Sequence, residues 1–102
     1  MQSRIPIDYE TLAALCRRYK VRRLAVFGSI LRDDFDPELS DADFLVEFEP
    51  ISASEEMKNY FALREELVNL LGRSVDLVED GAIRNPYILQ RIKDQQQVLY
   101  AA

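Results

Sequence analysis

Two aspartates separated by one residue are the side chains of this sequence best placed to do chemistry. Asp41 and Asp43 begin the run Asp41–Phe48, whose Phe and Val content is typical of a strand. Side chains alternate along a strand, so residues two positions apart point to the same face. Two like charges about 4 Å apart repel by roughly 4 kcal/mol at an effective dielectric constant of about 20. The pair therefore predicts a cation between them, and a hard divalent metal is the natural choice.

A third carboxylate, Asp76, lies in a second predicted strand, Ser74–Val78, between Val75 and Leu77. An unpaired charge in such an apolar setting would be expensive to desolvate. If the two strands are neighbours, the three carboxylates converge. Three protein oxygens, completed by phosphate and water, are the ligand set that Mg²⁺ prefers. Two ions about 3.5–4 Å apart can activate a hydroxyl and stabilise a leaving pyrophosphate.

The pair Gly28-Ser29 follows the apolar run Leu24–Phe27, which we expect to be a short buried strand. A brief helix from about residue 29 to 33 is expected next. Backbone N–H groups at its start, together with the helix dipole, would point at an anion. The Ser29 hydroxyl and Arg32, on the same side of that helical turn, add hydrogen-bond donors. The turn is therefore a predicted phosphate-binding site.

Composition narrows the classes of function. The chain has no histidine, which excludes Ser-His-Asp and Cys-His catalysis and histidine-based zinc sites. Its net charge of −5 argues against a dedicated nucleic-acid binder. No apolar run approaches the roughly 20 residues that span a bilayer, and the N-terminus lacks a secretory pattern, so we expect a cytoplasmic protein. The single cysteine, Cys16, is interpreted as a core residue.

The order of the predicted elements favours an α/β fold with a small sheet, formed by one domain over residues 1–102. We expect a helix from about Tyr9 to Tyr19 capped by Asp8, a long helix between Ser52 and Gly72, and a last helix opening at Asn85-Pro86. Residues 34–39 are expected to be a surface loop, and residues 98–100 an edge strand. The apolar side chains that we expect in the core from the last two helices are Met57, Tyr60, Phe61, Leu67, Val68, Leu71, Tyr87, Ile88, Leu89 and Ile92.

Each of these features has an ordinary structural interpretation when taken singly. A Gly-Ser pair is most often a plain turn, an Asp-x-Asp pair is as often a cap as a metal site, and Asp76 alone could be a satisfied buried carboxylate. The basic cluster Arg17, Arg18, Lys20, Arg22 and Arg23 is most simply a solvated helix end, and a docking patch for an acidic partner is the alternative.

Order and spacing connect the separate features. The runs Phe27–Arg32 and Ser40–Val46 together resemble the active-site signature of the DNA polymerase beta nucleotidyltransferase superfamily, and most closely that of the minimal nucleotidyltransferases. The resemblance implies the nucleotidyltransferase fold, a small mixed β-sheet flanked by helices. It also implies that Gly28 and Ser29 bind the triphosphate of ATP or another nucleoside triphosphate. Asp33 departs from the glycine usual after the arginine and adds negative charge there.

The same resemblance implies roles for the carboxylates and a biological setting. Asp41 and Asp43 would ligate both Mg²⁺ ions, and Asp76 would complete the site and orient the attacking hydroxyl. Minimal nucleotidyltransferases are typically encoded with a small helical HEPN-type protein, and some act as antitoxins that transfer AMP to a tyrosine of that partner. The alternatives are a non-catalytic partner that neutralises a neighbouring protein by binding and, more weakly, a small-molecule nucleotidyltransferase. Homo- or hetero-oligomers fit either function.

Overall fold

The structure, a computed structural model, describes residues 8–28 and 42–102. The predicted short helix, the predicted 34–39 loop and the residues Ser29, Arg32, Asp33 and Asp41 lie outside these ranges. The described elements are, in chain order, α1 (Tyr9–Arg18), β1 (Val21–Phe27), β2 (Ala42–Phe48), α2 (Ala53–Leu71), β3 (Val75–Glu79), the short 3-10 helix η2 (Asp80–Ala82), α3 (Pro86–Gln95) and β4 (Gln97–Ala101).

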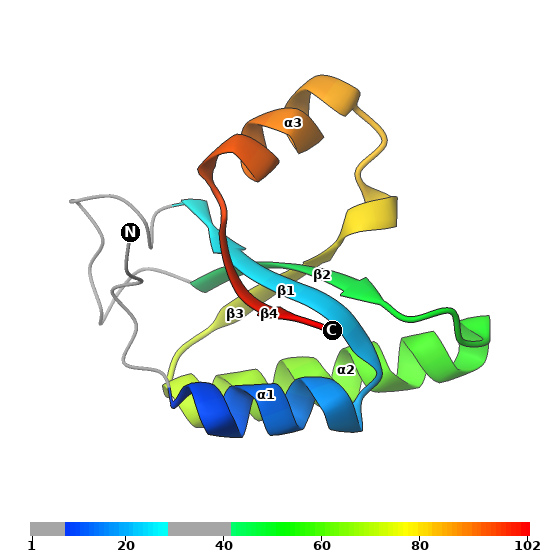
Figure 1. Ribbon diagram of the computed structural model, residues 1–102, viewed down its shortest axis with the longest axis vertical. Helices are drawn as coiled ribbons and strands as arrows, with labels where there is room; N and C mark the ends of the chain where they lie inside the picture. The colour runs from blue at the N-terminus through cyan, green and yellow to red at the C-terminus, as the bar shows by residue number, and fades with distance from the viewer. Residues whose placement is uncertain (1–7, 29–41) are drawn as a thin grey trace.

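Four strands form one sheet in the order β3-β2-β1-β4. β1 runs antiparallel to both of its neighbours, whereas β2 and β3 are parallel and joined by α2. A parallel pair needs such a crossover, because a tight hairpin can join only antiparallel strands. The predicted small mixed sheet flanked by helices is confirmed, and so is the edge strand near the C-terminus (Figure 1).

The helix ends follow the local signals in the sequence. The Asp8 carboxylate accepts a hydrogen bond from the Glu10 backbone N–H, and the Ser52 hydroxyl accepts one from the Glu55 backbone N–H. Asn85 caps α3 in the same way. These bonds satisfy N–H groups that have no partner inside a helix. Gly72 ends α2 in the left-handed conformation, where a side chain would be strained.

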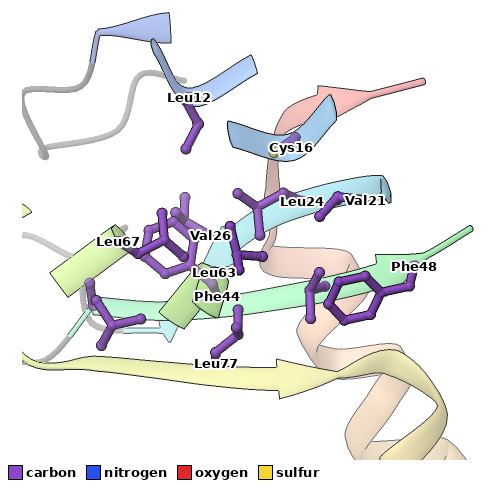
Figure 2. Close-up of a cluster of buried hydrophobic side chains, with 13 residues drawn as sticks. Leu12, Cys16, Val21, Leu24, Val26, Phe44, Phe48, Leu63, Leu67 and Leu77 are labelled. Atoms are coloured by element: carbon purple, nitrogen blue, oxygen red, sulfur yellow. The ribbon is translucent and has the colours of Figure 1, made fainter. Parts of the chain in front are cut away.

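The hydrophobic core lies between one face of the sheet and the helices α1 and α2 (Figure 1). Figure 2 shows side chains from both helices and from β1, β2 and β3 meeting in this layer. Its fully buried members are Leu12, Cys16, Leu24, Val26, Ala42, Phe44, Leu63 and Leu67. Cys16 is fully buried in this cluster, so its predicted core role is confirmed, and the burial raises the pKa of its thiol to about 12.

Several predicted core residues are instead exposed, and that part of the prediction is wrong. Met57 is 64% exposed, Phe61 60%, Tyr87 81% and Ile88 51%. On α2 the inner stripe is centred on Leu63 and Leu67, with Tyr60 packed beside them. Successive helix positions are rotated by about 100°, so Phe61 falls outside the stripe that contains Tyr60. No side chain of α3 is fully buried, and Leu89 and Ile92 are half-buried.

Within residues 8–28 and 42–102, no helix is both long and apolar enough to cross a membrane. The assignment of residues 1–102 to a single domain stays a prediction.

Candidate active site

The parallel pairing of β2 and β3 brings two of the three predicted aspartates together. Asp43 and Asp76 are direct partners in the register of the two strands. Neighbouring strands lie about 4.7–4.9 Å apart, and paired residues point to the same face. Their neighbours Ala42, Phe44 and Val75 are buried in the core. Because side chains alternate, the two aspartates lie on the face of the sheet opposite to the core.

The two carboxylates differ in their exposure. Asp43 is half-buried and Asp76 is exposed. Expecting Asp76 to be desolvated by its apolar flanks was therefore wrong. Val75 and Leu77 turn to the core side, and the alternation of the strand places Asp76 toward solvent. A ligand can reach this carboxylate directly.

Gly28 adjoins the carboxylate of Asp43. It directly follows β1, whose last residue, Phe27, pairs with Asp43 across the sheet. A Cβ atom added to Gly28 would lie 2.5 Å from Asp43 Oδ2 and 3.4 Å from its Cγ. The φ angle of Gly28 is +74°, a conformation that other residues rarely adopt. Only glycine fits here, so the predicted phosphate turn and the predicted metal ligand meet at this point.

The described part of the site suits a hard divalent cation. Two carboxylates on one sheet face, one of them exposed, offer the oxygen donors that Mg²⁺ takes, and a cation would offset their mutual repulsion. Among the residues that the structure describes, no three His, Cys, Asp or Glu side chains assemble into a metal-binding group. Asp41, the third predicted ligand, lies outside those residues, as do Ser29 and Arg32 of the predicted phosphate turn.

One anchoring contact beside the site was missed by the sequence analysis. The Tyr60 hydroxyl of α2 donates a hydrogen bond to the backbone carbonyl of Leu77, the residue after Asp76. It fastens the crossover helix to the strand that carries the exposed aspartate. The sequence pattern predicted Tyr60 only as a core residue. The hydrogen bond could not be predicted from neighbouring residues, because its acceptor is a backbone atom 17 positions away.

Comparison with known protein families and relatives identifies the class of protein to which this fold and these paired carboxylates belong. The sequence profile of the family described as "Nucleotidyltransferase domain" matches residues 9–99. A relative from Methanocaldococcus jannaschii, named as a candidate protein adenylyltransferase, is 44% identical over 80 residues, which cover 78% of each chain. The protein adenylyltransferase MntA of Thermococcus cleftensis is 38% identical over 71 residues, covering 70% of this chain and 68% of its own. The chain belongs to the nucleotidyltransferase domain family and is a nucleotidyltransferase.

Solved structures share this fold. One described as a candidate minimal nucleotidyltransferase superimposes with a TM-score of 0.61 at 31% identity, covering 90% of this chain and 96% of its own. A Shewanella oneidensis complex of a tri-AMPylated HEPN toxin with an MNT antitoxin gives a TM-score of 0.61 at 20% identity, covering 92% of this chain and 70% of that one. A toxin–antitoxin structure with AMP-PNP gives 0.67 at 20% identity, with 94% and 75% covered.

Proposed function

We propose that this protein transfers AMP from ATP to a hydroxyl group of a HEPN-type partner protein and thereby acts as an antitoxin. The observation that carries the proposal is the pairing of Asp43 with Asp76 on an open sheet face beside Gly28. Relatives named as protein adenylyltransferases support AMP as the transferred group. The fold neighbour that pairs an MNT antitoxin with an AMPylated HEPN toxin supports the class of partner.

Two groups of residues have separate proposed roles, phosphate binding and metal binding. The backbone at Gly28, the Ser29 hydroxyl and the Arg32 guanidinium hold the triphosphate, since all three supply donors to phosphate oxygens. Asp41, Asp43 and Asp76 would hold two Mg²⁺ ions, which when bound supply positive charge to the attacking and leaving oxygens.

The carboxylate of Asp76 is also proposed to orient the acceptor hydroxyl, because it is the exposed member of the described pair. The hydroxyl oxygen forms a bond to the α-phosphorus, and the bond from that phosphorus to the bridging oxygen breaks. Pyrophosphate leaves and the hydroxyl proton passes to solvent. Holding the two reactants in this orientation is the main contribution of the chain's own residues.

Mass spectrometry of the partner tests the proposal. The protein is incubated with a HEPN-type partner protein, ATP and Mg²⁺, and the partner is examined for an added AMP. We expect an adduct with the wild type and none with Asp41→Asn/Asp43→Asn, although this variant still binds the partner. If wild type and variant neutralise the partner equally well without nucleotide, the protein is a stoichiometric binder and the transfer proposal fails. An adduct on a small hydroxylated compound in place of the partner would also refute it.

A thermal-shift measurement tests the metal site without relying on turnover. A ligand that binds only the folded state raises the melting temperature. We expect Mg²⁺ to raise it for the wild type and to have a clearly smaller effect on Asp76→Asn. Equal shifts for the two proteins would remove Asp76 from the proposed metal site.

A further inference from the structure

The first half of α2 presents two large apolar side chains to solvent. Met57 is 64% and Phe61 60% exposed, and they lie one helical turn apart on the same side of the helix. The Phe61 ring stands edge-on to the Tyr60 ring, with 5.2 Å between the ring centroids. This contact helps to hold the exposed Phe61 ring in place. Two large neighbouring apolar side chains at the surface are typical of a contact site for another molecule.

This apolar pair borders one of two adjoining hollows. We call the two hollows together the α2–β3 groove. The hollow at Met57, Tyr60 and Phe61 has a volume of about 380 Å³. The second, of about 480 Å³, lies toward the ends of β2 and β3. Glu56 and Glu79 line both hollows and so join them into one groove.

The acidic half of the groove is completed by Glu47 and Asp80. Both of these carboxylates have cationic partners within the chain. Arg22 Nη1 lies 3.3 Å from Glu47 Oε1, and Lys93 Nζ lies 3.4 Å from Asp80 Oδ2.

The two carboxylates at the centre of the groove lack such compensation. Neither Glu56 nor Glu79 forms an ion pair with any residue that the structure describes. Burial, and next the charge of Glu56, raise the pKa of Glu79. The centre of the groove therefore carries negative charge that a cationic side chain from outside would stabilise.

From the exposed apolar pair and the uncompensated carboxylates beside it, we infer that the α2–β3 groove docks a basic, amphipathic segment of the acceptor protein. Its apolar side chains contact Met57 and Phe61, and its Lys or Arg side chains contact Glu56 and Glu79. The inference rests on the proposed function, because it takes the docked protein to be the one that receives AMP.

The groove is suitably placed for that role. β3 carries both Asp76 and Glu79, three residues apart, and strands rise about 3.3 Å per residue. A segment in the groove lies roughly 10 Å along the strand from the exposed Asp76 carboxylate. The odd spacing turns the Glu79 and Asp76 side chains to opposite faces, so the acceptor would reach Asp76 around the edge of the sheet at β3, the first strand in the sheet order. A second copy of this chain suits the groove less well, because its net charge of −5 would repel the acidic surface.

Binding measurements with the HEPN-type partner protein test the inference. Met57→Ser/Phe61→Ser should weaken its Kd at least about tenfold, the effect of removing apolar anchors from an interface. Glu56→Gln/Glu79→Gln should weaken it and flatten its dependence on salt, since screening acts on charge pairs. Tyr87→Ser on α3, where the ring is 81% exposed, and Glu65→Gln on the exposed side of α2 are the matched controls, with unchanged Kd. Melting curves establish that each variant is folded.

The outcomes separate the docking inference from the proposed function. An unchanged Kd for both groove variants would overturn docking even if AMP transfer is seen. Loss of binding in the groove variants alone supports docking even if no protein transfers AMP, in which case the function proposal is the one that fails. Dissociation of a homodimer by Met57→Ser/Phe61→Ser would assign the groove to self-association and overturn the inference.

Discussion

At the scale of single residues, two glycines with the same backbone conformation have different surroundings. Gly28 and Gly72 have φ angles of +74° and +66°. A Cβ atom at Gly28 would collide with the Asp43 carboxylate, whereas one at Gly72 would meet nothing within 4 Å. A side chain would strain the backbone at both positions. Only at Gly28 would it also displace Asp43, a proposed metal ligand.

Replacement of each glycine by alanine should therefore separate stability from activity. Gly28→Ala and Gly72→Ala should each lower the free energy of unfolding by about 1–2 kcal/mol, the cost of a left-handed L-residue. Gly28→Ala should in addition lower kcat/KM for AMP transfer by about 100-fold, because small displacements in a reacting site are costly. Urea denaturation and initial-rate assays measure the two effects. Equal activities of the two variants would show that the Gly28–Asp43 contact does not position the site.

The raised pKa of Glu79 predicts a pH-dependent stability. The charged groups around it are Glu56 from α2, Glu47, which pairs with Arg22, and Asp80, which pairs with Lys93. A carboxyl group whose pKa is higher in the folded state than its ordinary 4.5 destabilises the fold once it ionises. The penalty is absent below about pH 4.5, grows as pH rises through the folded-state pKa, and is complete above it.

Glu79→Gln should consequently melt at a higher temperature than the wild type at about pH 7, and the difference should vanish near pH 4. Melting curves across this range measure it. Glu65→Gln, on the exposed side of α2, controls for the change in net charge. A difference that is constant with pH would show that ionisation of Glu79 is not its cause.

At this scale the sequence predicted the adjacency of the candidate site's residues better than their exposure. Alternation along the strands and the order of the motifs placed Asp43, Asp76 and Gly28 together, and the structure has them side by side. The exposure of Asp76 was missed because it depends on which side of the sheet the helices cover, and neighbouring residues do not encode that side. The roles of Asp41, Ser29 and Arg32 stay predictions.

At the scale of the elements, helix ends were predicted well and helix faces less well. Caps depend on two or three consecutive residues, so Asp8, Ser52, Gly72 and Asn85 could be read directly. The inner face of a helix depends on the surface it packs against. α2 carries more apolar side chains than its contact with the sheet can cover, and the excess, Met57 and Phe61, faces solvent.

This contrast predicts that α2 and α3 respond differently to loss of their N-terminal caps. Ser52→Ala should lower the global free energy of unfolding by about 1 kcal/mol, because α2 anchors Leu63 and Leu67 in the core. Asn85→Ala should mainly increase local opening of α3, which has no fully buried side chain. Hydrogen exchange resolved by segment, together with urea denaturation, distinguishes global from local effects. Equal losses of global stability in the two variants would contradict this division.

At the scale of the whole molecule, the sheet has two faces with different tasks. The core cluster fills the face covered by α1 and α2 (Figure 1). Asp43 and Asp76 belong to the opposite face, because they alternate with the buried residues of β2 and β3. That opposite face is covered in part, since Ala25 and Leu45 are buried there near Asp80 and Gln96. The larger cluster of buried apolar side chains lies on the face covered by α1 and α2, whereas Asp76 on the other face stays exposed.

A core substitution on α2 tests this division of the molecule. Leu67 is fully buried, so Leu67→Ala removes apolar contacts and leaves a cavity, at a cost of about 2–5 kcal/mol. Folded domains are stable by only about 5–15 kcal/mol, so the urea midpoint should fall sharply. Tyr87→Ala, at a ring that is 81% exposed, should change stability by less than about 0.5 kcal/mol. Since Leu67 lies on the covered face, the folded fraction of Leu67→Ala should keep its kcat/KM for AMP transfer. A loss of kcat/KM larger than the loss of folded protein would show that the two faces are not independent.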